Sequence, residues 1–228
     1  MRTISLSLLT ILCLALTGFA QTTTFSEGPI DGNDNAFFIT GPNNPNFVGY
    51  VQDISNGFVA QASSSRGTAI DLELGEWIAN GFTPSSIGYE LGTAAFGTDV
   101  SVGTVALDSR NSHFLFTNAD GYDVYDVTTR FFLPTPMTAG NEYWLSLSNA
   151  SDAENSGTEA WDIPNGGLGG PATCNFRQSG TNFGDCGLGG ESFTLSTPQP
   201  ITPEPSSILL FGSGILGLAG ILRRKLKA

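Results

Sequence analysis

The strongest constraint on the fold lies between Gln21 and Ser196, where no stretch of useful length repeats its apolar residues with the period of a helix. Instead, short runs rich in Val, Ile, Phe, Tyr and Thr are separated by Gly, Asn, Asp and Pro, as in strands joined by turns. We expect strands at 36–40, 47–52, 57–62, 69–74, 85–91, 100–107, 113–117, 122–132, 142–148, 158–163 and 191–196. This spacing predicts an all-β fold, an antiparallel, jelly-roll-like β-sandwich over residues 21–196. Two smaller domains that divide near residue 108 are the alternative.

Two local patterns refine this expectation. Asp120-Gly121 stands between two of the runs and is a hairpin turn signal. Within Glu142–Ser148, every second side chain belongs to one apolar set, so the strand has an apolar face and a different opposite face. The apolar face consists of Tyr143, Leu145 and Leu147.

Residues 1–20 have the three parts of a secretory signal peptide. Arg2 precedes an apolar run, and Gly18 and Ala20 supply the small residues at positions −3 and −1 of a cleavage site. We therefore predict cleavage after Ala20, so that the mature chain begins at Gln21. A buried N-terminal helix is the alternative.

The C-terminus has the pattern of a short membrane span followed by positive charge. Residues 206–222 contain no charged residue and as a helix would measure about 25 Å, at the short end for a transmembrane helix. Basic residues follow at once in the tail 223–228, namely Arg223, Arg224, Lys225 and Lys227. By the positive-inside rule, this cluster places the C-terminus in the cytoplasm and the acidic middle of the chain outside.

A Pro-rich linker at 197–205 precedes the span and contains Pro203-Glu204-Pro205. A Pro-Glu-Pro tripeptide, a short apolar helix and a basic cluster, in this order over residues 203–228, closely resemble the PEP-CTERM sorting signal. The resemblance implies handling by an exosortase, a membrane-embedded cysteine protease or transpeptidase of Gram-negative bacteria. That enzyme would cut near the tripeptide and release the protein or transfer it to the cell surface, where such proteins are associated with extracellular polysaccharide and biofilm matrix. A plain single-span anchor is the alternative.

The middle of the chain, from about Gly57 to Ser196, resembles the choice-of-anchor domains that recur in bacterial surface proteins of this kind. The matching stretches are Ile87–Thr93, Tyr122–Val127, Glu142–Leu147, Trp161-Asp162 and Glu191–Phe193. This resemblance supports the β-sandwich and implies no catalytic residue.

Two of the three cysteines, Cys174 and Cys186, remain once the signal peptide is removed. They lie in Asn165–Gly190, which has nine glycines in 26 residues and is expected to be a long loop. In an exported chain such a pair favours a disulfide, which would stabilise the fold by about 3 kcal/mol if it acts through chain entropy. A zinc site would need further His or Cys ligands.

Charge is divided unevenly along the chain. Residues 21–205 contain four arginines, no lysine and all 21 acidic residues, a formal charge of −17, whereas the whole chain carries −12. Binding to nucleic acid requires Lys and Arg that displace counterions from phosphate, so we expect no nucleic-acid partner. The same charge keeps a domain soluble and away from anionic polymers, unless cations bridge the two.

The sequence contains no recognisable motif for catalysis or for binding a cofactor. His113 is the single histidine, and no Gly-x-Ser-x-Gly nucleophile elbow accompanies it. Asp31–Asn35 begins with EF-hand-like spacing but lacks the glycine and the glutamate that this calcium loop needs, so a polar turn is expected. Asp120, Asp123 and Asp126 recur every three residues, and on a strand Asp123 would point away from the other two. We therefore expect no catalytic residue, no cofactor and no metal.

These observations favour a non-enzymatic exported protein of the cell surface or extracellular matrix. It would be held briefly in the inner membrane, with its C-terminus in the cytoplasm, before an exosortase-type enzyme processes it. A carbohydrate-binding module is the second hypothesis, because exposed aromatic rings stack on sugars, although most aromatics in a β domain are core. The candidate aromatics are Trp144, Trp161, Tyr122 and Tyr125. A glycoside hydrolase that uses two of the carboxylates is the third.

Overall fold

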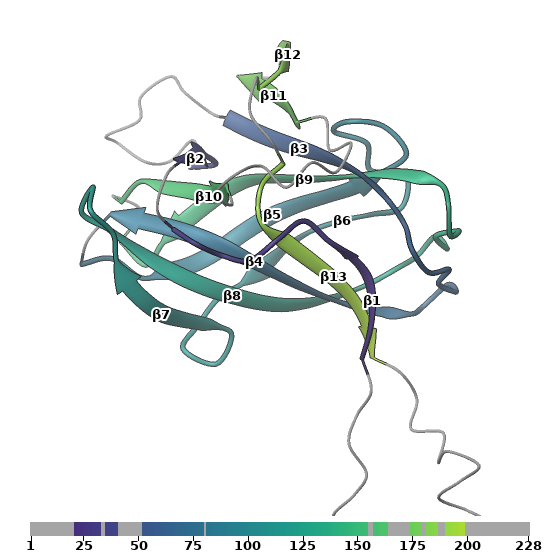
Figure 1. Ribbon diagram of the computed structural model, residues 1–228, viewed down its shortest axis with the longest axis horizontal. Coiled ribbons are helices and arrows are strands. Elements are labelled where there is room, and N and C mark those ends of the chain that lie inside the picture. The colour runs from purple at the N-terminus through teal and green to yellow at the C-terminus, as the bar shows by residue number, and fades with distance from the viewer. Residues whose placement is uncertain are drawn as a thin grey trace, which may run out of the picture. The chain divides into compact units, whose positions relative to one another are not determined.

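The computed structural model describes residues 21–32, 35–40, 52–79, 81–154, 157–163, 174–178, 181–186 and 190–198. These residues form strands and turns (Figure 1), and no helix among them is long and apolar enough to cross a membrane. The strands are β1 (Gln21–Ser26), β2 (Asn35–Phe38), β3 (Gln52–Val59), β4 (Ala69–Ala79), β5 (Pro84–Gly92), β6 (Ser101–Ala106), β7 (Ser112–Thr117), β8 (Tyr122–Phe132), β9 (Glu142–Asp152), β10 (Glu159–Ile163), β11 (Cys174–Gln178), β12 (Thr181–Asp185) and β13 (Phe193–Pro198). The predicted signal peptide, the Pro-Glu-Pro segment, the span at 206–222 and the basic tail lie outside the described residues.

The strands form two antiparallel sheets. In the first sheet, β4 pairs along its whole length with β8, and β8 pairs with β7. The other edge of β4 is shared, because β13 pairs with Asp71–Leu74 and β10 pairs with Glu76–Ile78. Outside these two strands lie β1 and β2, so β1, which begins the sandwich, pairs with β13, which ends it. The second sheet has the order β12-β11-β3-β9-β5-β6.

The hydrophobic core lies between the two sheets. Alternate residues of β4 point inwards, since successive side chains of a strand face opposite ways. Four of them, Ile70, Leu72, Leu74 and Ile78, are fully buried. They belong to one cluster with inward residues of the second sheet, among them Ile54, Ile87, Leu91, Leu145 and Leu147. Full burial of each such side chain contributes about 1.5–3 kcal/mol, and this shared core defines the fold as a β-sandwich.

The all-β sandwich predicted from the sequence is confirmed. The strands before and after residue 108 pair with each other, β4 with β8 and β5 with β9, and residues 22–198 form one compact unit, so the chain does not divide there. The turn signal Asp120-Gly121 does join the hairpin of β7 and β8, with Gly121 at a φ of 84° that favours glycine.

Two expectations in this part of the chain are wrong, and a third falls mainly on residues that are not described. Of the predicted strand at 47–52 only Gln52 is described, and β3 runs from there to Val59, over the start of the predicted strand at 57–62. The Gly-rich region Asn165–Gly190 was expected to be a loop, yet it contains β11 and β12. β11 forms because it pairs with β3 over five residues, and β12 pairs with β11 in turn. The predicted linker from residue 197 also begins late, because β13 extends to Pro198.

Candidate functional site

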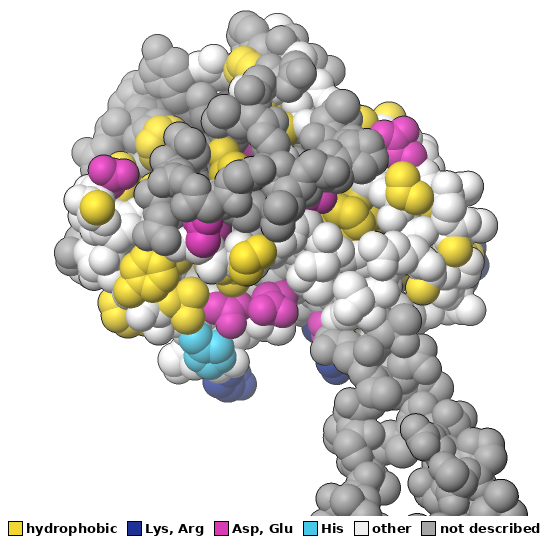
Figure 2. Space-filling model, viewed as in Figure 1, with side chains coloured by type: hydrophobic (Ala, Val, Ile, Leu, Met, Phe, Trp, Pro, Cys, Tyr) yellow, Lys and Arg dark blue, Asp and Glu magenta, His cyan; other side chains and the backbone are white. Residues whose placement is uncertain are grey.

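A cavity of about 510 Å³ lies on the outer face of the first sheet, and we call it the outer cavity. Its lining residues are Ser26, Gly28, Pro29, Ile30, Glu73, Leu115, Asp126, Phe193 and Thr194. Figure 2 shows acidic side chains on this face of the molecule, beside the histidine and beside hydrophobic side chains. None of the lining residues that the structure describes is basic, so these residues offer no counter-charge to an anionic ligand.

The alternation of two neighbouring strands positions the acidic groups of this cavity. Glu73 points outwards on β4 between the inward residues Leu72 and Leu74, and Asp126 does so on β8. Asp126 pairs in register with Gly75, two residues from Glu73, which makes the two acids diagonal neighbours on one face. The space beside Gly75 is filled by Asp162 and Ile30, whose atoms lie 2.7 and 2.8 Å from where a Cβ of residue 75 would stand.

Burial changes the pKa of both carboxyls, and repulsion from Asp126 adds to the change at Glu73. Burial raises the pKa of Glu73, and the negative charge of Asp126 raises it further. Burial also raises the pKa of Asp126, while His113, its register partner on β7, acts in the opposite direction. Asp126 Oδ1 is buried and has no hydrogen-bond partner among the described residues.

The remaining lining residues add hydroxyl groups and apolar walls. Ser26 and Thr194 share a hydrogen bond of 2.9 Å between their side-chain oxygens, and Thr194 is the register partner of Glu73 on β13. Ile30 and Leu115 supply apolar surface. Carboxylates accept hydrogen bonds, hydroxyls both donate and accept them, and apolar side chains contact C–H groups. This combination suits a neutral, polyhydroxylated ligand.

The aromatic residues proposed as a sugar platform are divided by the structure. Trp161 is fully buried and donates from Nε1 to the carbonyl of Ser192 at 3.0 Å, so it belongs to the core. Tyr125 is also buried, and its hydroxyl donates to the carbonyl of Phe82. Tyr122 is half-buried, and its ring contacts that of Trp77 with centroids 6.0 Å apart. None of these residues lines the outer cavity.

Trp144 remains a half-exposed aromatic on the second sheet. It lies on β9 in register with Gly57 of β3 and with Gly92 of β5. A Cβ atom added at Gly57 would lie 3.1 Å from the Trp144 ring, so the absence of a side chain there makes room for the indole. This residue therefore keeps one face available outside the core.

Asp162 is a buried carboxylate that organises the segment considered for calcium. It accepts hydrogen bonds from the backbone N–H groups of Asp31 at 3.1 Å and Gly32 at 3.0 Å, and from Trp77 Nε1 at 2.7 Å. Ser192 Oγ donates to it as well, at 3.1 Å. Burial raises the pKa of Asp162, and the hydrogen bond from Trp77 opposes this. The start of the segment is thus a turn held by Asp162, while residues 33 and 34 lie outside the described residues.

The three aspartates spaced by three residues diverge, as expected. Asp123 is buried and accepts hydrogen bonds from Thr117 Oγ1 at 2.7 Å and from the backbone N–H of Gly81 at 3.2 Å. Asp126 faces the outer cavity on the opposite side of the strand. Asp120 lies in the turn, where its N–H donates to Asn118 Oδ1.

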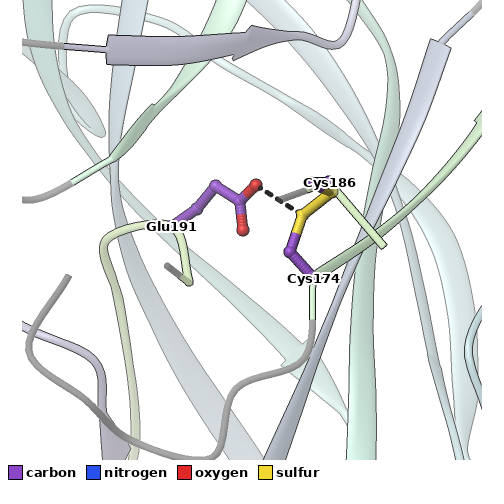
Figure 3. Close-up of side chains that lie close together, drawn as sticks. All are labelled: Cys174, Cys186 and Glu191. Carbon is purple, nitrogen blue, oxygen red and sulfur yellow. Dashed lines mark hydrogen bonds between the residues drawn. A yellow bond between two sulfur atoms is a disulfide. The ribbon is translucent and has the colours of Figure 1, made fainter. Parts of the chain in front are cut away.

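The two cysteines form a third notable group, together with a glutamate. Cys174 and Cys186 are joined by a disulfide, with Cα atoms 5.4 Å apart, and Glu191 lies beside it (Figure 3). The possible metal-ligand atoms of these three residues, two sulfurs and one carboxylate oxygen, lie within 4.8 Å of one another. Metal binding requires thiolates, and here the sulfurs are bonded to each other. In the disulfide form the two sulfurs therefore supply no thiolate ligand.

Sequence reasoning missed Glu73, Asp162 and Glu191 as site residues. Each is an acid within or beside a strand rich in apolar residues, and that position is the only signal the sequence carries. Their partners lie far away along the chain, 130 residues in the case of Gly32 and Asp162.

Comparison with known proteins identifies one feature of the chain. A family model for the PEP-CTERM protein-sorting motif matches residues 202–225. The match includes the Pro-Glu-Pro tripeptide and the apolar segment, and it confirms that resemblance. It does not extend to the ectodomain, so the resemblance to choice-of-anchor domains stays an interpretation. No curated protein matches the chain.

Proposed function

We propose that this chain, which carries a PEP-CTERM sorting motif, ends as a non-enzymatic protein of the cell surface or extracellular matrix associated with extracellular polysaccharide. The observation that carries the proposal is the motif at residues 202–225, which implies an exported protein, transiently anchored in the membrane at its C-terminus and processed by an exosortase. The basic tail supports a cytoplasmic C-terminus before processing, with the sandwich outside.

The arrangement of the first and last strands of the ectodomain supports this proposal. The sandwich begins with β1 and ends with β13, and these two strands pair. The polypeptide that leads to the sorting motif therefore leaves the sandwich from β13, which lies between β1 and β4. Processing after residue 198 would remove none of the strands.

A second candidate function, carbohydrate binding, is favoured by the outer cavity. Its carboxylates, hydroxyls and apolar walls suit a neutral polysaccharide, and its lack of basic residues disfavours an acidic one. The two proposed functions are compatible, because a matrix protein can bind a neutral polysaccharide without catalysing a reaction.

Mass spectrometry of the surface-located protein tests the sorting proposal. We expect a mature C-terminus near Pro203-Glu204-Pro205, without Arg223–Lys227, and accumulation of the unprocessed chain in a strain that lacks the exosortase. An intact basic tail on the surface-located protein would instead support a plain single-span anchor.

An array of neutral polysaccharides tests the binding candidate. The probe is the exported sandwich, residues 21–198, compared with a variant that carries Glu73→Ala and Asp126→Ala. We expect the double variant to bind at least about tenfold more weakly, and Trp144→Ala on the other sheet to bind normally. Loss of binding in Trp144→Ala alone would move the sugar site to the second sheet. Release of reducing ends from any polysaccharide would overturn the non-enzymatic proposal.

A further inference from the structure

The two cysteines of the disulfide differ in burial, and Cys174 holds the enclosed sulfur. Cys174, on β11, is fully buried, whereas Cys186 is half-buried. An external thiol or disulfide therefore reaches Cys186 more easily than Cys174. Exchange at this pair should begin at Cys186, with Cys174 as the thiol that later closes the bond.

Glu191 is the acid that contacts the enclosed sulfur. Its Oε1 lies 3.2 Å from Cys174 Sγ, within hydrogen-bond reach for sulfur, and the side chain is fully buried (Figure 3). Its second oxygen, Oε2, has no hydrogen-bond partner among the described residues. Asn56, the register partner of Cys174 on β3, is the polar neighbour of this carboxyl.

The surroundings of Glu191 favour its neutral form. Burial raises its pKa to about 8, the nearby Asn56 side chain opposes this, and the negative charge of Glu27 adds to the rise. No basic residue faces it within the described part of the chain. A thiol has an ordinary pKa of about 8.5, so a proton can pass between the two groups with little change in free energy.

We propose that Glu191 carries the proton of Cys174 during thiol–disulfide exchange at this pair. In oxidation, the Cys186 thiolate attacks the disulfide of an external oxidant RSSR, forms Cys186–S–S–R and releases RS⁻. The Glu191 carboxylate then takes the proton from the Cys174 thiol. The resulting thiolate attacks Cys186 Sγ, the protein disulfide forms, and a second RS⁻ leaves with the electron pair of the broken S–S bond.

Reduction runs through the same steps in reverse. An external thiolate attacks Cys186 Sγ, and the Cys174 sulfur leaves as a thiolate with the bonding electron pair. The protonated carboxyl of Glu191 donates its proton to this sulfur, and the negative charge passes from the thiolate to the carboxylate. Glu191 thereby makes a buried disulfide exchangeable from one side.

Oxidised glutathione serves as the probe, acting on the reduced full chain with Cys13→Ser, so that Cys174 and Cys186 are the only thiols. Acid quenching and mass spectrometry follow the mixed disulfide at Cys186 and its conversion to the protein disulfide. Glu191→Gln keeps the size of the side chain but cannot accept the proton. We expect it to slow the second step at least about tenfold, so that the mixed disulfide accumulates, with the first step unchanged. Glu159→Gln, at a buried carboxyl away from the disulfide, is the matched control and should behave as the parent chain.

An equal rate of the second step in Glu191→Gln and the parent would overturn the proposal, as would equal slowing of both steps. Infrared spectroscopy of Cys186→Ser provides a measurement that does not depend on the folding of Glu191→Gln. In that variant the S–H stretching band of Cys174 should lie at the frequency of a hydrogen-bonded thiol. A band at the frequency of a free thiol would contradict the contact on which the proposal rests.

Discussion

Replacing Glu159 by Gln should make the sandwich less sensitive to alkaline pH. Glu159 on β10 and Glu76 on β4 both lie in the interior, with 1% and 0% of their surface exposed. Both oxygens of Glu76 and Oε2 of Glu159 lack hydrogen-bond partners among the described residues. Burial raises the pKa of Glu76 well above its ordinary value, and the nearby Glu159 adds to this.

The magnitude follows from the shift at Glu159, whose pKa burial raises from 4.5 to about 8. The pKa of this carboxyl is higher in the folded state than in the unfolded state. The free energy of unfolding is therefore unaffected below the unfolded pKa and falls as the pH rises towards the folded pKa. At 1.36 kcal/mol per pH unit, the loss from this group is about 5 kcal/mol in all, of which about 3–4 kcal/mol develops between pH 5 and pH 8. Gln at this position resembles the neutral acid and has no proton to lose.

Urea unfolding of residues 21–198, followed by tryptophan fluorescence at pH 5 and pH 8, measures the effect. Glu159→Gln should match the parent within about 1 kcal/mol at pH 5 and exceed its free energy of unfolding by about 3–4 kcal/mol at pH 8. Glu142→Gln, at an exposed position of β9, is the control and should follow the parent at both pH values. A parallel pH dependence of Glu159→Gln and the parent would refute the argument that this carboxyl is kept protonated by burial.

Three further predictions concern stability and use the same urea assay. Asp162→Ala should lower the free energy of unfolding by about 3–5 kcal/mol, because it leaves several buried donors, including the Trp77 indole N–H, without an acceptor. Gly75→Ala should cost about 1–3 kcal/mol, since its Cβ would lie 2.7 Å from the Cβ of Asp162. Arg177→Ala should cost about 2 kcal/mol, because its buried partner Asp53 would lose its cation, whereas Arg130→Ala, with a side chain 56% exposed, should cost less than about 1 kcal/mol.

The strand pattern of the sequence predicted which residues face the core, but not what covers the outer faces. In β9, Tyr143, Leu145 and Leu147 are buried between the sheets, as their alternation indicates. Ser146, on the opposite face, is nevertheless only 2% exposed. The backbone N–H of Phe96 donates to its hydroxyl at 3.2 Å, which shows that the chain after β5 folds over this face. Such a cover depends on the path of a loop, which the two-residue period of a strand does not encode.

The candidate sites were beyond sequence reasoning for a related reason. Glu73 and Asp126 come together only through the register of β4 with β8, and a shift by one residue would turn one of them into the core. Glu191 reaches Cys174 because β11 pairs with β3, and the Gly-rich composition around β11 gave no strand signal. The disulfide was predicted from the export of the chain and from the number of its cysteines. Neither of these indicates which acid lies beside the disulfide.

Burial also changes what the large negative charge of the exported region means. Eight acidic residues are buried among the described residues: Glu27, Asp53, Glu76, Asp123, Asp152, Glu159, Asp162 and Glu191. The pKa values of Glu159 and Glu191 are raised to about 8 and that of Glu76 is raised well above its ordinary value, so burial favours the neutral form of all three. The formal charge of −17 therefore overstates the field that a partner meets. A polymer that approaches the outer cavity is repelled less than the composition suggests, and local contacts with Glu73 and Asp126 have more weight in deciding what binds.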